Sequence, residues 1–290
     1  MKLGKRAVWA PTDGFNAKDA AAFAQRVEDW GYSALWIPEA LGREPMSHAS
    51  WLLANTENLI LATGIASIYA RDAVASRLAQ ISLNEQSGGR FLMGLGVSHR
   101  PFVEGVRGQD YTSPVATMGS YLEAMKATPT MGQPAPEEPK TVIAALGPKM
   151  LELSASHADG AHPYLVTPEY TEQARKAVGK KKFLCVEQKV LFETDASKAR
   201  EVARQALAIY LPLPNYRNNL LRQGFTADEI DNDGGADRLV DAMVIWGDET
   251  KINDTIEAHL KAGATQVCIQ ALNPTGARTP DERILQALAP

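Results

Sequence analysis

Short apolar runs alternate along the chain with longer segments whose apolar residues recur at helical spacing. The clearest unit begins with the apolar run 59–67, continues through the helix-period segment 73–86 and ends with a second apolar run, 91–96. Two successive strands joined by a helix predict a parallel pair with a right-handed crossover. The carboxyl ends of these strands should therefore point the same way, and functional loops lie at that end in parallel α/β folds.

The same alternation extends over the whole chain. Strands are predicted at 6–10, 34–38, 59–67, 91–96, 141–145, 161–166, 183–192 and 266–272, and helices at 18–30, 48–57, 73–86, 115–127, 148–158, 168–176, 196–211, 236–246, 249–262 and 278–288. This order favours one (βα)8 TIM barrel over residues 1–290. Residues 212–247 exceed an ordinary connection, and we expect this insertion, between the seventh and eighth strands, near the carboxyl-end face. An open doubly wound sheet is the alternative, but the chain lacks its Gly-x-Gly-x-x-Gly turn.

Composition narrows the class of protein. The 290 residues are 45% hydrophobic and 22% charged, with a net charge of −4 and no basic cluster, so no nucleic-acid partner is expected. No apolar run approaches a membrane span or a signal peptide, and we expect a cytoplasmic protein. Cys185 and Cys268 lie in apolar runs typical of buried free thiols. His157 and His162 do not have the spacing of metal ligands, so no metal is expected.

Common catalytic signatures are absent, but polar residues lie at the ends of several predicted strands, near the carboxyl-end face of the expected barrel. These are Glu39, Tyr69, Arg71, Ser98, His99, His162 and Tyr164. His99 follows the flexible Gly94-Leu95-Gly96 segment, which predicts a residue beside a bound ligand; the alternative is a solvated loop histidine. Glu39 is either a site residue or the partner of Arg43, four positions on.

Two further segments carry candidate ligand contacts. Lys149 follows Pro148 at the start of a predicted helix, where a phosphate could bind; a solvated lysine is the alternative. Tyr216 and Arg217, in the insertion, either cover the substrate or pack the insertion itself.

Five segments together resemble one family, the bacterial luciferase-like oxidoreductases, and within it an actinobacterial branch assigned to the deazaflavin coenzyme F420. They read ALWIPEALGRE, ATGIASIYARD, GRFLMGLGVSH, ALGPKMLELSASHADGAHPYLV and LPNYRNNLLRQGF, in the family's order and over nearly the whole chain. The resemblance implies a (βα)8 barrel with an insertion after strand seven, a cofactor at the carboxyl end of the strands, and a homodimer.

The resemblance also implies positions for cofactor contacts. Ser67 and Ile68 match the place of a non-proline cis peptide that supports the central ring of the cofactor, and Trp9 would lie near that ring. The remaining matches are Gly96, Val97 and Ser98, which would line the cofactor, and Gly160, Ala161, His162 and Pro163, whose backbone would approach its side chain or phosphate.

One departure leaves the proton-transfer residue open. Relatives that oxidise sugars or alcohols with F420 carry Asp-His after strand two, where this chain has Glu39-Ala40. Glu39 or His99, with help from Tyr69, would then handle the proton of a small organic substrate. The resemblance favours hydride transfer with F420, whose acidic tail Arg71, Arg100 and Lys149 could contact. The alternatives are an FMN-dependent monooxygenase and a cofactor-binding barrel without turnover.

Overall fold

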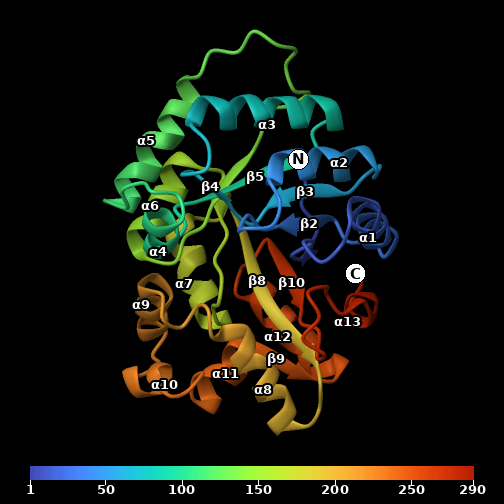
Figure 1. Ribbon diagram of the computed structural model, residues 1–290, viewed down its shortest axis with the longest axis vertical. Helices are drawn as coiled ribbons and strands as arrows, with labels where there is room; N and C mark the ends of the chain where they lie inside the picture. Colours follow the sequence, from blue (N-terminus) through green and yellow to red (C-terminus); the bar gives the residue numbers. More distant parts are fainter.

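A closed parallel barrel forms the centre of the protein, as the alternating pattern predicts. The computed structural model describes residues 1–290 (Figure 1). The strands are β1 (Arg6–Trp9), β2 (Ala34–Ile37), β3 (Ile60–Thr63), β4 (Ala66–Ser67), β5 (Phe91–Gly96), β6 (Thr141–Ile143), β7 (Gly160–Ala161), β8 (Phe183–Phe192), β9 (Val244–Gly247) and β10 (Gln266–Ala271). The barrel runs in the order β1-β2-β3-β5-β6-β7-β8-β10 and closes between β10 and β1.

Helices surround the barrel (Figure 1). They are α1 (Ala17–Asp29), α2 (Pro45–Ala54), α3 (Ala73–Ser87), α4 (Arg100–Gly105), α5 (Pro114–Ala127), α6 (Pro148–His157), α7 (Pro168–Val178), α8 (Ala196–Leu207), α9 (Pro214–Arg222), α10 (Ala227–Asp231), α11 (Asp237–Met243), α12 (Glu249–Lys261) and α13 (Glu282–Ala287). Local signals set their ends. The Asp72 side chain accepts a hydrogen bond from the Ala75 N–H at the start of α3, and Gly88, with φ of 67°, ends that helix. None of these helices is long and apolar enough to cross a lipid bilayer.

Side chains alternate between the inside of the barrel and the helix layer. On β1, Val8 packs with the helices, whereas Ala7 and Trp9 belong to the interior cluster. Cys185 and Cys268 are buried free thiols in the same interior cluster, which confirms the prediction made for them.

The third predicted strand is interrupted. Residues 59–67 form β3 and then β4, with a cis peptide bond between Gly64 and Ile65. The placement of this bond at Ser67-Ile68 was therefore wrong by three residues. A Cβ on Gly64 would lie 2.7 Å from Trp9 Nε1, so this turn has no space for a larger residue.

Two other predicted elements differ. The strand at 161–166 is reduced to β7, because Pro163 lacks an N–H for the ladder and Leu165 has a φ of 55°. The predicted helix 236–246 ends at Met243, and Val244–Gly247 forms β9 beside Lys189–Phe192 of β8.

The connection between β8 and β10 contains α8 to α12 and β9. In Figure 1 the helices α8 to α11 gather at the lower end of the view, opposite α3. Tyr216 and Leu220 of α9 pack with the interior cluster, together with Trp9 of β1. The start of this connection therefore lies over the open end of the barrel.

Candidate active site

Two adjoining cavities lie at the carboxyl end of the barrel strands. The first, of about 420 Å³, is here named the polar cavity; its lining includes Ser98, Tyr111, Lys149, Asn215, Asn218 and Arg222. The second, of about 330 Å³, is named the aromatic cavity; its lining includes Trp9, Phe102, Ile209, Tyr210, Leu213 and Tyr216. The two share seven residues: Ile65, Ser98, His99, Ala144, His162, Tyr164 and Tyr216. They therefore form one site with two chemically different halves.

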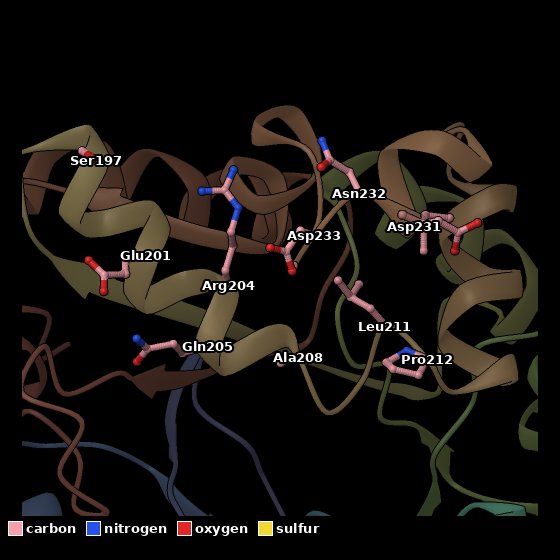
Figure 2. A pocket seen from close by; sticks show the side chains of 12 residues that line it. Ser197, Glu201, Arg204, Gln205, Ala208, Leu211, Pro212, Asp231, Asn232 and Asp233 are labelled. Atoms are coloured by element: carbon pink, nitrogen blue, oxygen red, sulfur yellow. The ribbon is translucent and has the colours of Figure 1, made fainter.

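A larger groove, of about 820 Å³, lies on the surface between α8 and α10 (Figure 2). The Arg204 guanidinium group in this groove donates to Asp237 and to the Gly235 carbonyl. No barrel strand contributes to this groove, so we place the active site in the two adjoining cavities.

His99 lies where the two cavities meet. It follows β5, and its Nδ1 is 3.1 Å from Asn215 Oδ1 in α9. The amide oxygen only accepts, so Nδ1 carries the proton and Nε2 is left as the basic atom. Burial lowers the pKa of His99 below its ordinary value of 6.5, and the hydrogen bond with Asn215 opposes this change. His99 is therefore a neutral base at neutral pH.

His162 presents a second neutral imidazole. Its Nδ1 donates to the Cys185 carbonyl at 2.7 Å, and its ring stacks on Trp36 with centroids 4.5 Å apart. Burial lowers the pKa of His162 to about 4. Nε2 is buried without a partner in the chain. A buried acceptor without a donor costs about 1–3 kcal/mol, so a ligand N–H or O–H at this atom would be stabilising.

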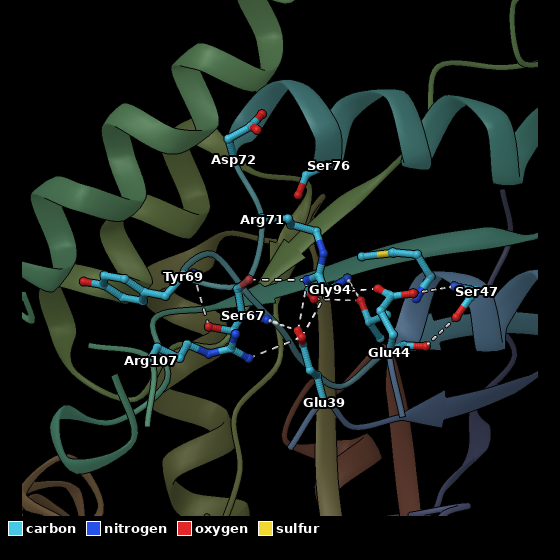
Figure 3. A network of polar contacts seen from close by, with 12 residues as sticks. Glu39, Glu44, Ser47, Ser67, Tyr69, Arg71, Asp72, Ser76, Gly94 and Arg107 are labelled. Carbon is cyan, nitrogen blue, oxygen red and sulfur yellow. Dashed lines mark hydrogen bonds and ion pairs between the residues drawn. The ribbon is translucent and has the colours of Figure 1, made fainter. Parts of the chain in front are cut away.

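The Glu39 carboxylate ties three loops together (Figure 3). Arg71 donates to both of its oxygens at 2.9 Å, and the Ser67 N–H donates at 2.7 Å. Arg107 approaches it at 3.5 Å. The pairing of Glu39 with Arg43 was wrong; Arg43 instead donates to the Phe15 carbonyl. Because its oxygens are occupied, Glu39 is suited to holding the loops after β2 and β4 in place.

The turn at Gly64 and Ile65 forms the part of the cavity wall beside Trp9. Trp9 Nε1 donates to the Gly64 carbonyl at 3.0 Å, and Ile65 lines both cavities. A Cβ on Gly96 would lie 2.3 Å from Ile65 Cδ1, so glycine at this position lets the Ile65 side chain remain where it is.

The polar cavity contains an anion-binding arrangement. Gly147 is the N-cap of α6, and no side chain satisfies the first N–H groups of that helix. Lys149 lies in the first turn, and a Cβ on Gly147 would be 3.8 Å from Arg222 Nη1. Neither cation forms an ion pair within the chain. Pro148 has no N–H, and the Met150 N–H donates to the Gly147 carbonyl. The Lys149 N–H and the two cations are therefore the groups that favour a phosphate or carboxylate at this helix amino terminus.

Comparisons with known proteins show the family of this chain. The family model of luciferase-like monooxygenases matches residues 2–266. The chain belongs to this family. A relative from Mycobacterium tuberculosis, Rv3520c, whose name assigns it provisionally to the coenzyme F420-dependent oxidoreductases, is 25% identical over 93% of this chain and 95% of its own.

Solved structures show the same fold. An F420-dependent secondary alcohol dehydrogenase, in complex with an F420-acetone adduct, has a TM-score of 0.77 at 15% identity, over 99% of this chain and 97% of that one. The oxygenating constituent of 3,6-diketocamphane monooxygenase from Pseudomonas putida, in complex with FMN, has a TM-score of 0.68 at 14% identity, over 98% and 96%. Both kinds of cofactor therefore occur on this fold.

The structure brings together some of the site residues predicted for this luciferase-like protein. Those lining the cavities are Trp9, Glu39, Gly96, Val97, Ser98, His99, Lys149, His162, Tyr164 and Tyr216. Those outside the lining are Ser67, Ile68, Tyr69, Arg71, Arg100, Gly160, Ala161, Pro163 and Arg217. Ile68 is buried in the core, and a Cβ on Gly160 would lie 2.1 Å from the Phe183 carbonyl oxygen. Arg100 pairs with Glu104 on its own helix.

The lining residues that sequence reasoning missed include Ile65, Tyr111, Asn215 and Arg222. Ile65 was missed because the cis bond was predicted at Ser67-Ile68. Asn215 and Arg222 were within the insertion, but nothing in their sequence pattern indicated which strand end they would meet.

Proposed function

We propose that this luciferase-like protein is an oxidoreductase that uses coenzyme F420 to transfer hydride to or from a small organic substrate. The observation that carries the proposal is the division of the site. Two free cations and an uncapped helix amino terminus occupy one half, aromatic side chains occupy the other, and a neutral histidine lies between them. The F420-dependent relatives support the same assignment.

The residues present fit this cofactor. Lys149, Arg222 and the first turn of α6 would hold its acidic groups. Ile65 and Gly96 would support the ring, and the unpartnered His162 Nε2 would accept a hydrogen bond from a donor on the cofactor. When bound, F420 supplies the hydride chemistry.

The chain itself would supply position and proton transfer. His99 Nε2 would accept the substrate proton in the oxidation direction and return it in the reduction direction, and Asn215 would hold the imidazole in the required tautomer. Glu39 would act as a positioning residue through Arg71. The aromatic walls would exclude water.

Reversing the charges of the polar cavity should weaken binding of F420. Lys149→Glu and Arg222→Glu should each raise the Kd for F420 by about tenfold, or about 1.4 kcal/mol, because each replaces an attraction with a repulsion. Fluorescence titration measures this change. Lys180→Glu, on an exposed loop outside the cavities, is the matched control and should leave the Kd unchanged. Equal effects at all three positions would contradict an anion site at α6.

An FMN-dependent monooxygenase is the second candidate, because an FMN-containing structure shares the fold. Separate titrations with F420 and FMN distinguish the two. Our proposal predicts the tighter complex with F420.

We also propose that the protein is a homodimer that uses α2 and α3. Val74 and Leu78 lie on one face of α3 with exposed fractions of 50% and 44%, and Trp51 on the neighbouring α2 is 45% exposed. Large apolar side chains exposed on two packed helices are typical of an association surface. Light scattering should give a dimer mass for the native chain and a monomer mass for Leu78→Arg. The control Met131→Arg should remain a dimer; a native monomer at micromolar concentration would contradict the proposal.

A further inference from the structure

We infer that the aromatic cavity selects a neutral, largely apolar substrate with a single hydroxyl or carbonyl oxygen, and that it rejects carboxylated or phosphorylated molecules. The inference rests on the proposed function, because it assigns the acidic cofactor to the polar cavity. It is carried by how charges are distributed between the two halves of the site.

No cation is available in the aromatic cavity. Its one charged lining residue is Glu39, whose carboxylate is already neutralised by Arg71 and Arg107. His99 and His162 are neutral there, because burial lowers the pKa of each. An anionic group entering this cavity would lose its hydration without gaining a partner, which is strongly unfavourable.

The nearest buried cation is also unavailable. Lys189 Nζ lies 3.2 Å from Glu187 Oε1 and 3.8 Å from the centre of the Tyr164 ring. It is 4.9 Å from the centre of the Tyr210 ring. Tyr164 and Tyr210 line the cavity, whereas Lys189 and Glu187 do not. The ion pair therefore packs against the two aromatic rings from outside the cavity, and its charges are not available to a ligand.

The walls themselves favour apolar contact. Tyr210 packs edge-on to Tyr216 at 5.2 Å, and Trp9 packs against Tyr164 at 5.5 Å. Phe102, Ile209 and Leu213 complete the apolar lining. A polar atom of the substrate would meet His99, whose ring is 5.5 Å from that of Tyr216. One oxygen on an otherwise apolar molecule matches this arrangement.

Ile209 allows the inference to be tested without disturbing the core. It lines the cavity but is 69% exposed, so Ile209→Lys adds a cation at the rim of the cavity. Met131→Lys adds the same charge at a fully exposed loop position outside the cavity and is the matched control.

The experiment measures the Kd of cyclohexanol and of cyclohexanecarboxylate by calorimetry, for the protein saturated with F420 and for the protein alone. For the native chain, cyclohexanol should bind about tenfold more tightly or better, because the carboxylate finds no partner. Ile209→Lys should reduce the ratio of the carboxylate Kd to the cyclohexanol Kd by about fivefold. Met131→Lys should leave it unchanged.

Equal or tighter binding of the carboxylate to the native chain would overturn the inference, as would no saturable binding of either probe. The same holds if both lysine variants change the ratio equally. If F420 binds and any of these results is obtained, the inference is rejected and the proposed function is not. If F420 does not bind, the proposed function fails, and the ratio measured on the protein alone then decides the inference.

Discussion

Replacing His99 with alanine should lower kcat by about 10²–10⁴-fold, the usual contribution of a positioned general acid or base. The Kd for F420 should change little, because Lys149 and Arg222 remain in place. Steady-state kinetics and a parallel F420 titration measure the two effects. His157→Ala, an exposed histidine near the end of α6 and outside both cavities, is the control and should retain full turnover.

The pH profile provides a readout specific to His99. In the oxidation direction the imidazole must be unprotonated, so kcat should fall as the pH falls through its pKa, which lies below 6.5. The hydrogen bond that His99 Nδ1 donates to Asn215 Oδ1 raises that pKa, so Asn215→Ala should move the acid limb to lower pH. Unchanged turnover in His99→Ala would remove this residue from the mechanism. Tight F420 binding with no turnover of any neutral alcohol or ketone would favour a binding protein.

Replacing Arg71 with alanine should lower the free energy of unfolding by about 3–5 kcal/mol, because it leaves the Glu39 carboxylate buried without its main partner. The Arg71 and Glu39 side chains are 12% and 7% exposed, and both terminal guanidinium nitrogens of Arg71 donate to Glu39. Arg107, at 3.5 Å, should keep the loss towards the lower end of that range. Urea unfolding followed by circular dichroism measures it.

Arg100→Ala is the matched control for this prediction. Arg100 also pairs with a glutamate, but it is 59% exposed and its partner lies one helical turn away. Its removal should cost less than about 1 kcal/mol. If the two variants lost the same stability, the Glu39 network would be no more than a surface ion pair, and its positioning role would be unsupported.

The barrel could be predicted because each strand and helix has its own hydrophobic period, and these periods depend only on local sequence. The short strand β9 could not be predicted in this way. Val244 to Gly247 continues the helical pattern before it, and its strand conformation comes from pairing with β8. The strand character was set by a tertiary contact.

Site residues could be predicted from the sequence only where they lie near the end of a predicted strand. His99 could be placed because it lies shortly after a predicted strand, and His162 because it lies within one. Asn215 could not, because it lies 116 positions from His99 and meets it only when the insertion folds over the barrel. The resemblance placed the cis bond at Ser67-Ile68, three residues after its position in the structure, where the Trp9 side chain leaves no space for a Cβ on Gly64.

The central claim is tested most directly by fluorescence titration of the purified protein with F420 and, separately, with FMN. We predict saturable, tight binding of F420 and much weaker binding of FMN, with the preference reduced in Lys149→Glu and Arg222→Glu. Tighter binding of FMN would contradict the account and direct the next assay to oxygen uptake. Binding of neither would contradict the assignment of the two cavities as a cofactor site.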